Sequence, residues 1–398
     1  MKRSTFIRLA LGASASLGAA LPSLPTTIAR GEPAADVPAQ AKNRSLQLEI
    51  EHAIDQGLAF LKTKQDAAGF WSNADYPALT GLVLNGFLSS PTNADKTHPD
   101  FIQKGFKYLL SCAKPDGGIY GKGLANYNTC VVVMALAAAG SDAYGDTLRK
   151  AREFLIGQQN FYPKQDGKMN PYEGGIGYGD DGPHSDVSNT TFALEALRAT
   201  QSQVYGQDVA AAKDLNWDAA VAFLQRCQNL PQTNAQPWVT GDPKNVGGFI
   251  YTPIAEDNHA EDDMDGKKVP RSYGSMSYSG LLSYIYADLG KQDPRVTAVY
   301  EWLGRNYSVK ENPGLGSSGL FYYYHTMAKT LATYGADEIQ LAGGKSVNWR
   351  HDLSLKLINL QAGNGSWVNS ESGRWWEKDP VLVSSYCVRA LEMIHPGV

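Results

Sequence analysis

The chain has 398 residues and a formal net charge of −4, and 43% of its residues are hydrophobic. This content can form a sizeable core, either in one large repeat domain or in two or three domains of average size. The chain contains no basic block, which argues against nucleic acid as the main partner, and no polybasic strip that would bind an acidic membrane surface.

The N-terminus has the pattern of a bacterial-type export signal. A charged start, Met1-Lys2-Arg3, precedes a short Ala-rich apolar segment, and Thr27-Ile28-Ala29 places small residues at the usual cleavage offsets. The charged pair at its start is similar to that of a twin-arginine signal. We expect residues 1–29 to be a signal peptide and residues 30–45 a linker, so that the mature protein is exported to the periplasm or the extracellular space. No later segment reaches the roughly 18 apolar residues that a membrane helix needs, so the mature chain is expected to have no membrane span.

The four cysteines form no C-x-x-C pair. Cys130 and Cys387 lie in apolar helical runs, which predicts buried thiols that pack as small hydrophobic groups. A bridge between Cys112 and Cys227 is open to an exported protein, although the sequence favours free thiols.

From residue 46 to residue 398 a two-part pattern recurs six times. Each copy begins with an amphipathic helix, as at Phe154-Leu155, which should be half-exposed. A glycine-aromatic turn follows, as at Gly174-Gly175-Ile176-Gly177-Tyr178, where glycine permits a positive φ and the aromatic side chain fastens the turn to its neighbour. The second helix is apolar nearly all round, as in residues 131–139, and must be buried on every side. The six turns are expected at residues 69–71, 117–121, 174–178, 247–251, 319–323 and 365–367.

This pattern predicts an all-α fold, an α/α toroid of six helical hairpins. Amphipathic helices would form the outer ring and apolar helices the inner ring. The first and last copies lack the polar faces of capping repeats, which favours a closed ring over an open solenoid. Two long excursions, Phe161–Pro183 and Gln232–Tyr273, should form loops at one mouth of the barrel. The acidic run 261–265 lacks the spacing of a calcium loop and is expected to be a solvated loop.

The phrases helix, Gln-Gln, Asp-Gly-Gly-aromatic, helix resemble the repeats of squalene/hopene cyclases and of protein prenyltransferase β subunits. The resemblance covers most of the chain after about residue 46 and implies a terpenoid cyclase-like toroid. In the cyclases the acid is the middle Asp of an Asp-x-Asp-Asp-Thr motif that begins an inner helix. Here the matching phrase is Asp186-Val187-Ser188-Asn189-Thr190, with Ser188 at the position of the acid. Because a hydroxyl cannot protonate an alkene as a carboxylic acid does, the cyclase acid motif is not intact.

In the prenyltransferases a zinc ion is held by Asp, Cys and His. His325 looks like the zinc histidine, but the preceding inner helix offers Gly274-Ser275-Met276-Ser277, with neither an Asp nor a Cys. The resemblance therefore implies no zinc site, and we predict no metal and no cofactor.

Two residues are candidates for a catalytic role, each with a structural alternative. Asp186 would act as an acid or as the N-cap of its helix, and His325 would face the lumen or pack in the core. Asp181 and His184 would form an acid/base or cation site at the mouth, or a solvated loop. The predicted ligand-binding residues are Asn128, Asp181, His184, Ser188, Asn189, Tyr273, Tyr278, Tyr324 and Tyr386.

No hydrolase elbow, metalloprotease motif or nucleotide-binding loop is present. Three functions stay open at this point. The first is an isoprenoid-handling toroid, either a carrier or a cyclase- or transferase-like enzyme, with an apolar or small-molecule ligand. The second is a non-catalytic binding or scaffold protein. The third is a carbohydrate-active lyase or hydrolase, since α/α toroids also host these. The sequence leaves the oligomeric state open.

Overall fold

The computed structural model describes residues 43–92, 99–162, 169–179, 184–206, 214–262, 266 and 268–398. The predicted signal peptide, nearly all of the predicted linker and Asp181 lie outside these residues, so their assignments stay predictions. In the described part of the chain, six helices form an outer ring: α1 (Arg44–Lys62), α3 (Asp100–Ser111), α5 (Gly145–Gly157), α7 (Trp217–Cys227), α9 (Pro294–Arg305) and α11 (Trp349–Leu360). Six form an inner ring: α2 (Pro77–Ser89), α4 (Ala125–Ala139), α6 (Val187–Tyr205), α8 (Gly274–Tyr286), α10 (Leu320–Tyr334) and α12 (Pro380–Ile394).

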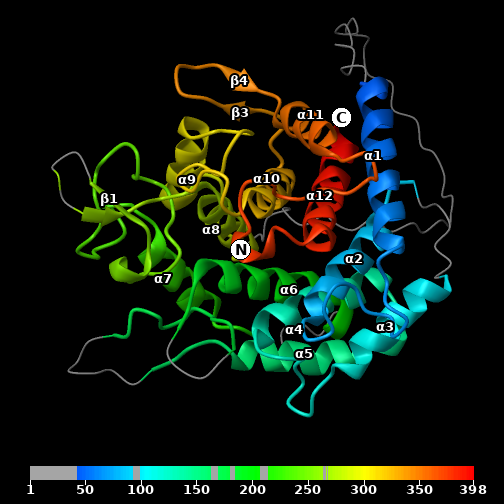
Figure 1. Cartoon of the computed structure of the whole chain (residues 1–398). Helices are drawn as coiled ribbons and strands as arrows, with labels where there is room; N and C mark the ends of the chain where they lie inside the picture. Colours follow the sequence, from blue (N-terminus) through cyan, green and yellow to red (C-terminus); the bar gives the residue numbers. More distant parts are fainter. Residues whose placement is uncertain are drawn as a thin grey trace, which may run out of the picture.

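The inner ring is closed. Each even-numbered helix packs against the next, and α12 packs back against α2 (Figure 1). The odd-numbered helices lie outside this ring, as α5 does against α4 and α6. The predicted all-α toroid is confirmed. Among the described helices, none has both the length and the apolar character needed to cross a membrane.

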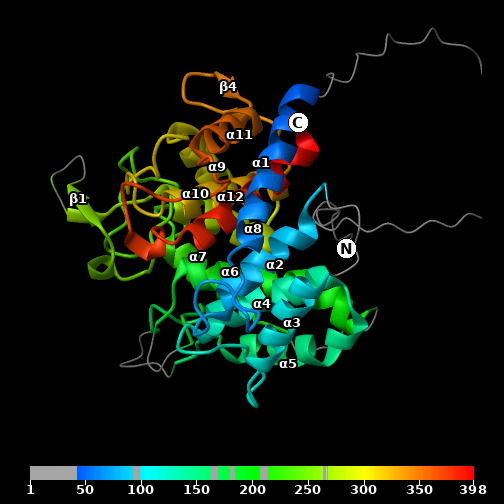
Figure 2. The ribbon, with the colours of Figure 1, turned by 45° about the vertical axis from the view of Figure 1, so that its right-hand side comes forward.

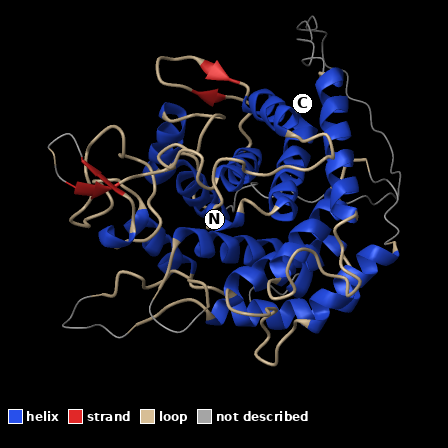
Figure 3. Cartoon of the chain, in the orientation of Figure 1, coloured by secondary structure: helices blue, strands red, loops and turns tan. Residues whose placement is uncertain are grey.

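Two short antiparallel hairpins interrupt the helical pattern. They pair β1 (Ala260–Asp262) with β2 (Lys268–Pro270), and β3 (Ile339–Gln340) with β4 (Ser346–Val347). Both hairpins lie at the edge of the molecule, away from the inner helices (Figures 2 and 3). The sequence pattern did not predict them, because each strand has only two or three residues.

The helices are buried as their composition predicts. In α1 the buried residues include Ile50, Ile54, Leu58 and Leu61, which form one stripe at helical spacing. In α4 nearly every residue from Ala125 to Leu136 is buried. Cys130, Cys227 and Cys387 are buried, and all four cysteines are free thiols, as expected.

A glutamine at the end of the outer helix ties four of the six turns to the next repeat. Gln65 donates from Nε2 to the turn carbonyl of Gly69 and to the carbonyl of Phe101 in the next outer helix, at 3.0 and 2.8 Å. Gln361 makes the same pair of bonds, to Gly365 and to Ala53 of α1, both at 3.0 Å. Repeat six therefore docks onto repeat one as other repeats dock onto their successors. Gln159 and Gln228 complete the set.

The turn glycine has a steric role in this docking. Gly365 has a φ of +85°, and a Cβ there would lie 2.4 Å from the carbonyl oxygen of Gln56 in α1. Only glycine permits both the backbone conformation and the close approach of the neighbouring helix.

A hydroxyl in the first turns of the inner helix completes the repeat. Its oxygen accepts from the backbone N–H of the turn residue that the helix buries, at 2.9 to 3.0 Å. The five pairs are Thr80 with Trp71, Thr129 with Ile119, Thr190 with Ile176, Ser277 with Phe249, and Ser384 with Trp367. Since these N–H groups are buried, each hydroxyl prevents the cost of an unsatisfied donor.

Repeat five departs from the prediction. The expected turn at residues 319–323 is wrong, because α10 already begins at Leu320, directly after Gly319 with its φ of +63°. The turn of this repeat lies earlier and is closed by a bridge between Asn312 and Gly316. His325 consequently lies one turn deeper along the inner helix than the sequence pattern implied.

Candidate functional site

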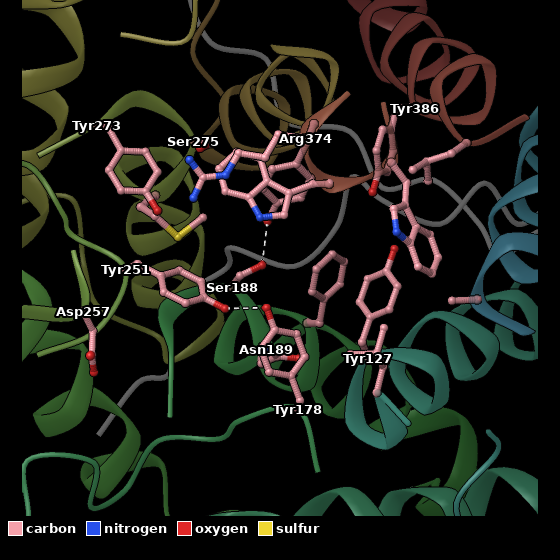
Figure 4. A pocket seen from close by; sticks show the side chains of 18 of the residues that line it. Tyr127, Tyr178, Ser188, Asn189, Tyr251, Asp257, Tyr273, Ser275, Arg374 and Tyr386 are labelled. Atoms are coloured by element: carbon pink, nitrogen blue, oxygen red, sulfur yellow. Dashed lines mark hydrogen bonds between the residues drawn. The ribbon is translucent and has the colours of Figure 1, made fainter. Parts of the chain in front are cut away.

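A cavity of about 650 Å³ opens at the end of the barrel where all six inner helices begin (Figure 4). Its size falls within the range of small-molecule sites. The residues around it are Tyr76, Ala78, Leu79, Leu124, Tyr127, Tyr178, Ser188, Asn189, Phe192, Tyr251, Glu256, Asp257, Asn258, His259, Tyr273, Ser275, Met276, Tyr322, Arg374, Trp375, Trp376, Leu382 and Tyr386. Most of this lining is aromatic or aliphatic.

Both predicted excursions reach the cavity, as expected for loops at one mouth. Tyr178 comes from the first excursion, and Tyr251, residues 256–259 and Tyr273 come from the second. The hydroxyls of Tyr178 and Tyr251 share a hydrogen bond of 2.7 Å, which joins the two loops across the cavity (Figure 4).

Asp186 is fully buried, does not line the cavity and caps α6. Its Oδ1 accepts from the backbone N–H of Asn189 at 2.7 Å, and its Oδ2 accepts from the side-chain amide of Asn189 at 2.8 Å. His184 Nε2 lies 3.1 Å from the same Oδ2. That hydrogen bond raises the pKa of His184, although burial partly opposes the rise. The carboxylate is thus occupied by groups that position the start of α6.

Ser188 and Asn189, two of the predicted ligand-binding residues, line the cavity. Their binding of a ligand stays a prediction. The Ser188 hydroxyl lies 3.0 Å from the hydroxyl of Tyr322 on α10, across the cavity. Asn189 also contacts Asn126 of α4, whose side-chain amide donates to the Asn189 carbonyl at 3.2 Å. The residue at the position of the cyclase acid therefore faces the cavity as a hydrogen-bonded hydroxyl.

Tyr273 and Tyr386 also line the cavity. Tyr386 and Tyr127 of α4 lie on the same side of the cavity (Figure 4). Burial raises the pKa of Tyr127 to about 12 and holds the pKa values of Tyr273 and Tyr386 well above their usual range. These phenols are therefore neutral near pH 7 and offer hydrogen bonds rather than charge.

His325 is buried behind Tyr386 and does not line the cavity. Its ring stacks on the Tyr386 ring with a centroid separation of 5.3 Å. Burial and the nearby cations Lys329 and Arg389 hold the pKa of His325 well below its usual range, so the imidazole is neutral. Within the described part of the chain, its buried Nδ1 has no hydrogen-bond partner.

Three other predicted residues lie away from the cavity. Asn128 accepts from the backbone N–H of Ala78 at 3.0 Å and so caps the neighbouring helix α2. The Tyr324 hydroxyl donates to the carbonyl of Val309 at 2.8 Å, on the outer side of α10. Tyr278 is buried between helices, 5.7 Å from the Tyr323 ring.

Several cavity residues are not indicated by the sequence pattern. Tyr127, Phe192 and Tyr322 lie on inner helices, and Arg374 precedes an exposed pair, Trp375 and Trp376, at the rim. Both tryptophans have left-handed φ values, 53° and 64°, which are rare for such residues. The two adjacent tryptophans that follow Gly373 and Arg374 are the sequence feature that marks the rim.

The loop that carries Arg374, Trp375 and Trp376, here called the rim loop, is held by side-chain contacts on both sides. The Arg374 guanidinium lies 4.3 Å from the Trp375 ring centroid, and its NH1 lies 3.1 Å from His259 Nε2. The Trp376 ring contacts Tyr76 edge-on, with a centroid separation of 4.6 Å. The loop therefore connects the second excursion to the start of α2.

The carboxylates around the cavity come from a loop. Of the described lining residues, only Glu256 and Asp257 carry a carboxyl group, and the Tyr172 hydroxyl donates to Asp257 at 2.9 Å. The described residues contain no cluster of three or more His, Cys, Asp or Glu side chains that could hold a metal ion. The described inner helices place no acid at the cavity.

Comparison with known proteins agrees with this architecture. Residues 78–245 match the family model of the squalene-hopene cyclase C-terminal domain. No curated protein matches the chain.

Solved structures match the fold over most of the chain. The type II terpene cyclase MstE from Scytonema superposes with a TM-score of 0.53 at 12% identity, over 88% of this chain and 99% of that one. A family 76 glycoside hydrolase from a bovine Bacteroides thetaiotaomicron strain gives a TM-score of 0.55 at 11% identity, over 87% and 78% of the two chains. An inactive variant of an alpha-1,6-mannanase from Salegentibacter sp. HEL1_6, in complex with alpha-1,6-mannotriose, gives 0.52 at 9% identity, over 87% and 99%.

Proposed function

Because this chain is a terpenoid cyclase-like α/α toroid, we propose that it binds an isoprenoid or a similarly apolar small molecule in its aromatic cavity without protonating it. The observation that carries this proposal is the lining itself, in which Tyr, Phe, Met and Leu side chains from the inner helices face one cavity. Structures of MstE hold geranylgeranyl dihydroxybenzoate as substrate and merosterolic acid A as product.

The lining favours apolar ligands on energetic grounds. Each square ångström of apolar surface removed from water contributes about 25 cal/mol, so a ligand that buries roughly 300 Å² gains about 7 kcal/mol before the entropic cost of association. The tyrosine hydroxyls at the cavity wall would accept or donate hydrogen bonds to a single polar group on such a ligand.

The chemical groups near Ser188 support the proposal that the ligand is not protonated. A strong acid must present a carboxylic proton to the ligand, and the Ser188 hydroxyl cannot supply one. Asp186, two residues before Ser188, is buried at the start of α6 and accepts two hydrogen bonds from Asn189. These features support binding over protonation-initiated cyclisation.

The ligand can be identified by extraction. The mature protein would be purified, extracted with organic solvent and analysed by mass spectrometry. We expect an isoprenoid or related apolar compound from the wild type. Met276→Trp, which enlarges a side chain that lines the cavity, should abolish recovery. Met169→Trp, at an exposed methionine outside the cavity lining, is the matched control and should leave recovery unchanged. Recovery of no compound from the wild type, with no binding of added isoprenoids, would contradict the proposal.

A second candidate function is suggested by the loop carboxylates. Glu256 and Asp257 line the same cavity as the exposed pair Trp375 and Trp376. A sugar ring can stack on tryptophan while carboxylates assist hydrolysis. The fold matches to a family 76 glycoside hydrolase and to an alpha-1,6-mannanase support the choice of a mannan as the test substrate. Release of reducing ends from α-1,6-mannan, lost in Glu256→Gln or Asp257→Asn, would establish hydrolysis. If neither ligand nor hydrolysis is found, the non-catalytic scaffold is the remaining candidate.

We also propose that the mature protein works outside the cytoplasm, on the strength of the N-terminal sequence. Expression in a bacterial host with fractionation, followed by N-terminal sequencing of the exported form, tests this. Cleavage before Arg30 is the expected result. A full-length protein retained in the cytoplasm would contradict export.

A further inference from the structure

Four aromatic side chains cross the lumen and form the floor of the cavity. Tyr127 of α4 meets Phe192 of α6 edge-on at 4.9 Å, and Phe192 lies 6.4 Å from Tyr322 of α10. Tyr322 lies 5.9 Å from Tyr386 of α12. The four side chains thus form a continuous row of ring contacts that links four inner helices, which we call the aromatic floor.

A layer of titratable side chains lies directly beneath this floor. Each floor residue is followed three positions later, about 4.5 Å further along its helix, by a polar or titratable residue. These residues, the lower layer, are Cys130, Glu195, His325 and Arg389. All four floor residues line the cavity and none of the lower layer does, so the cavity ends at the floor.

The lower layer is held by side-chain contacts that connect it to the deeper turns. Glu195 Oε2 lies 2.8 Å from Lys329 Nζ, which joins α6 to α10 across the lumen. Arg389 NH1 lies 2.5 Å from Glu392 Oε2 on the same helix. The Glu195 and Lys329 side chains are only 10% and 16% exposed, so both charges are largely shielded from water. The lumen therefore changes from aromatic to charged within one helical turn.

We infer that the aromatic floor and the charged layer beneath it set an upper size limit on the ligand, which makes Phe192, Glu195 and Lys329 specificity-determining residues. This inference rests on the proposed binding of an isoprenoid. The ligand class is an isoprenoid of about 15 to 20 carbons, because at about 30 Å³ for each water-sized group a 650 Å³ cavity holds roughly twenty such groups.

The limit has a steric part and an electrostatic part. A longer chain must first displace the ring of Phe192, whose position in the floor is fixed by contacts on two sides. It must then enter a region where its apolar carbons would separate Glu195 from Lys329. Leaving either charge buried and unpaired is strongly unfavourable. Removing the floor alone is therefore not enough to admit a longer apolar ligand.

Three probes of increasing length test this inference on the full mature chain. Farnesol, geranylgeraniol and squalene have about 15, 20 and 30 carbons. They therefore lie below, at and above the number of carbon groups that the cavity volume accommodates. Binding would be measured by native mass spectrometry and by quenching of tryptophan fluorescence. The wild type should bind farnesol and geranylgeraniol and should bind squalene at least tenfold more weakly than geranylgeraniol.

Variants separate the two parts of the limit. Phe192→Ala opens the floor and should leave squalene binding within about threefold of wild type. The triple variant Phe192→Ala, Glu195→Leu, Lys329→Met also replaces the ion pair by apolar side chains, a change that buried pairs often tolerate. It should bind squalene at least tenfold more tightly than Phe192→Ala. Glu195→Leu with Lys329→Met, with the floor intact, is the control and should keep the wild-type limit. Thermal unfolding of each variant confirms that it is folded.

The outcomes are distinguishable. Binding of all three probes by the wild type would overturn the size limit and leave the proposed function standing. Binding of none would overturn the proposed function and this inference with it. Squalene binding by Phe192→Ala that equals that of the triple variant would show that the charged layer sets no limit.

Discussion

Asn189 donates twice to the carboxylate of Asp186, once from its backbone N–H at 2.7 Å and once from its side-chain amide at 2.8 Å. The first bond is an N-cap and the second fixes the side chain that faces the cavity. This geometry assigns Asp186 the task of starting α6 and orienting Asn189. The resemblance to the cyclases thus extends to the position of the motif at the start of an inner helix. The Asp186 carboxylate of this motif caps that helix.

Replacing Asp186 by alanine should destabilise the fold and leave the ligand site usable. The change removes an N-cap and leaves the buried amide of Asn189 without its acceptor, so the free energy of unfolding should fall by about 2 to 3 kcal/mol. Urea denaturation measures this loss. Asn216→Ala, which removes the side-chain oxygen that caps α7 by accepting from the backbone N–H of Ala219, is the control and should cost about 1 kcal/mol. Loss of ligand binding in a folded Asp186→Ala protein would indicate a direct role for this carboxylate.

The contribution to stability of the hydroxyl that recurs in five repeats can be tested at Thr190. Its Oγ1 accepts from the buried backbone N–H of Ile176 at 3.0 Å. Thr190→Val keeps the shape but leaves this donor unsatisfied, so we expect a loss of about 1 to 3 kcal/mol in the free energy of unfolding. Thr190→Ser should restore most of the stability because it restores the acceptor.

The control for Thr190 is Thr333→Val. The Thr333 hydroxyl donates only to the carbonyl of Lys329 within its own helix, at 2.7 Å, so its loss should change stability by less than about 1 kcal/mol. Equal effects of the two valine variants would show that the turn contact adds nothing beyond an ordinary hydroxyl.

The repeated sequence pattern made the closed ring of helices predictable, whereas the irregular parts of the fold could not be predicted from it. The apolar and amphipathic helices, the turn glycines and the ordinary first and last repeats together predicted a closed toroid, and the contacts of Gln361 with α1 confirm the closure. An apolar helix such as α4 gives no periodic signal for the face that meets the lumen, so Tyr127 was not distinguished from its buried neighbours. The turn of repeat five was misplaced because Gly319 resembles a turn glycine but begins the helix.

The residues of the candidate site also divide into those that the sequence indicated and those that it did not. Ser188 and Asn189 were found because a family motif marks their position, and Tyr273 and Tyr386 because they stand near inner-helix starts. Arg374 reaches the cavity through a loop whose path depends on two left-handed tryptophans, and no local pattern predicts that conformation.

Ring closure can be tested at Gln361. Gln361→Ala removes one hydrogen bond to Gly365 in its own turn and one to Ala53 of α1, which joins repeat six to repeat one. Gln65→Ala removes the equivalent bonds, one to the turn of repeat one and one to repeat two. Because the two side chains have the same kind of partners, each variant should lower the free energy of unfolding by a similar amount, about 1 to 2 kcal/mol. Chemical denaturation followed by circular dichroism gives both values. No effect of Gln361→Ala beside a clear effect of Gln65→Ala would mean that the ring is open in solution.

Glu392 should make the stability of the fold depend on pH. Burial raises the pKa of Glu392 to about 8, although the hydrogen bond from Arg389 opposes the rise. In the unfolded chain a glutamate has a pKa of about 4.3, so between about pH 4 and pH 8 the folded state holds a proton that the unfolded state releases. The contribution of this group to stability is fully present below the unfolded pKa and is lost as the pH rises through the folded pKa. The free energy of unfolding of the wild type should therefore fall as the pH rises across this window.

Glu392→Gln isolates this effect, because the amide keeps the size of the side chain and does not titrate. The difference in unfolding free energy between wild type and variant should shift steadily in favour of the variant from pH 5 to pH 8, as measured by urea denaturation at several pH values. Glu153→Gln, at an exposed glutamate that pairs with Arg149 on α5, is the control for the removal of a carboxylate at the surface. His184, whose raised pKa gives a trend of the same sign, is present in every protein compared and cancels in the difference. Parallel stability curves for wild type and Glu392→Gln would show that Glu392 is ionised in the folded state, in which case Arg389 outweighs burial at the base of the lumen.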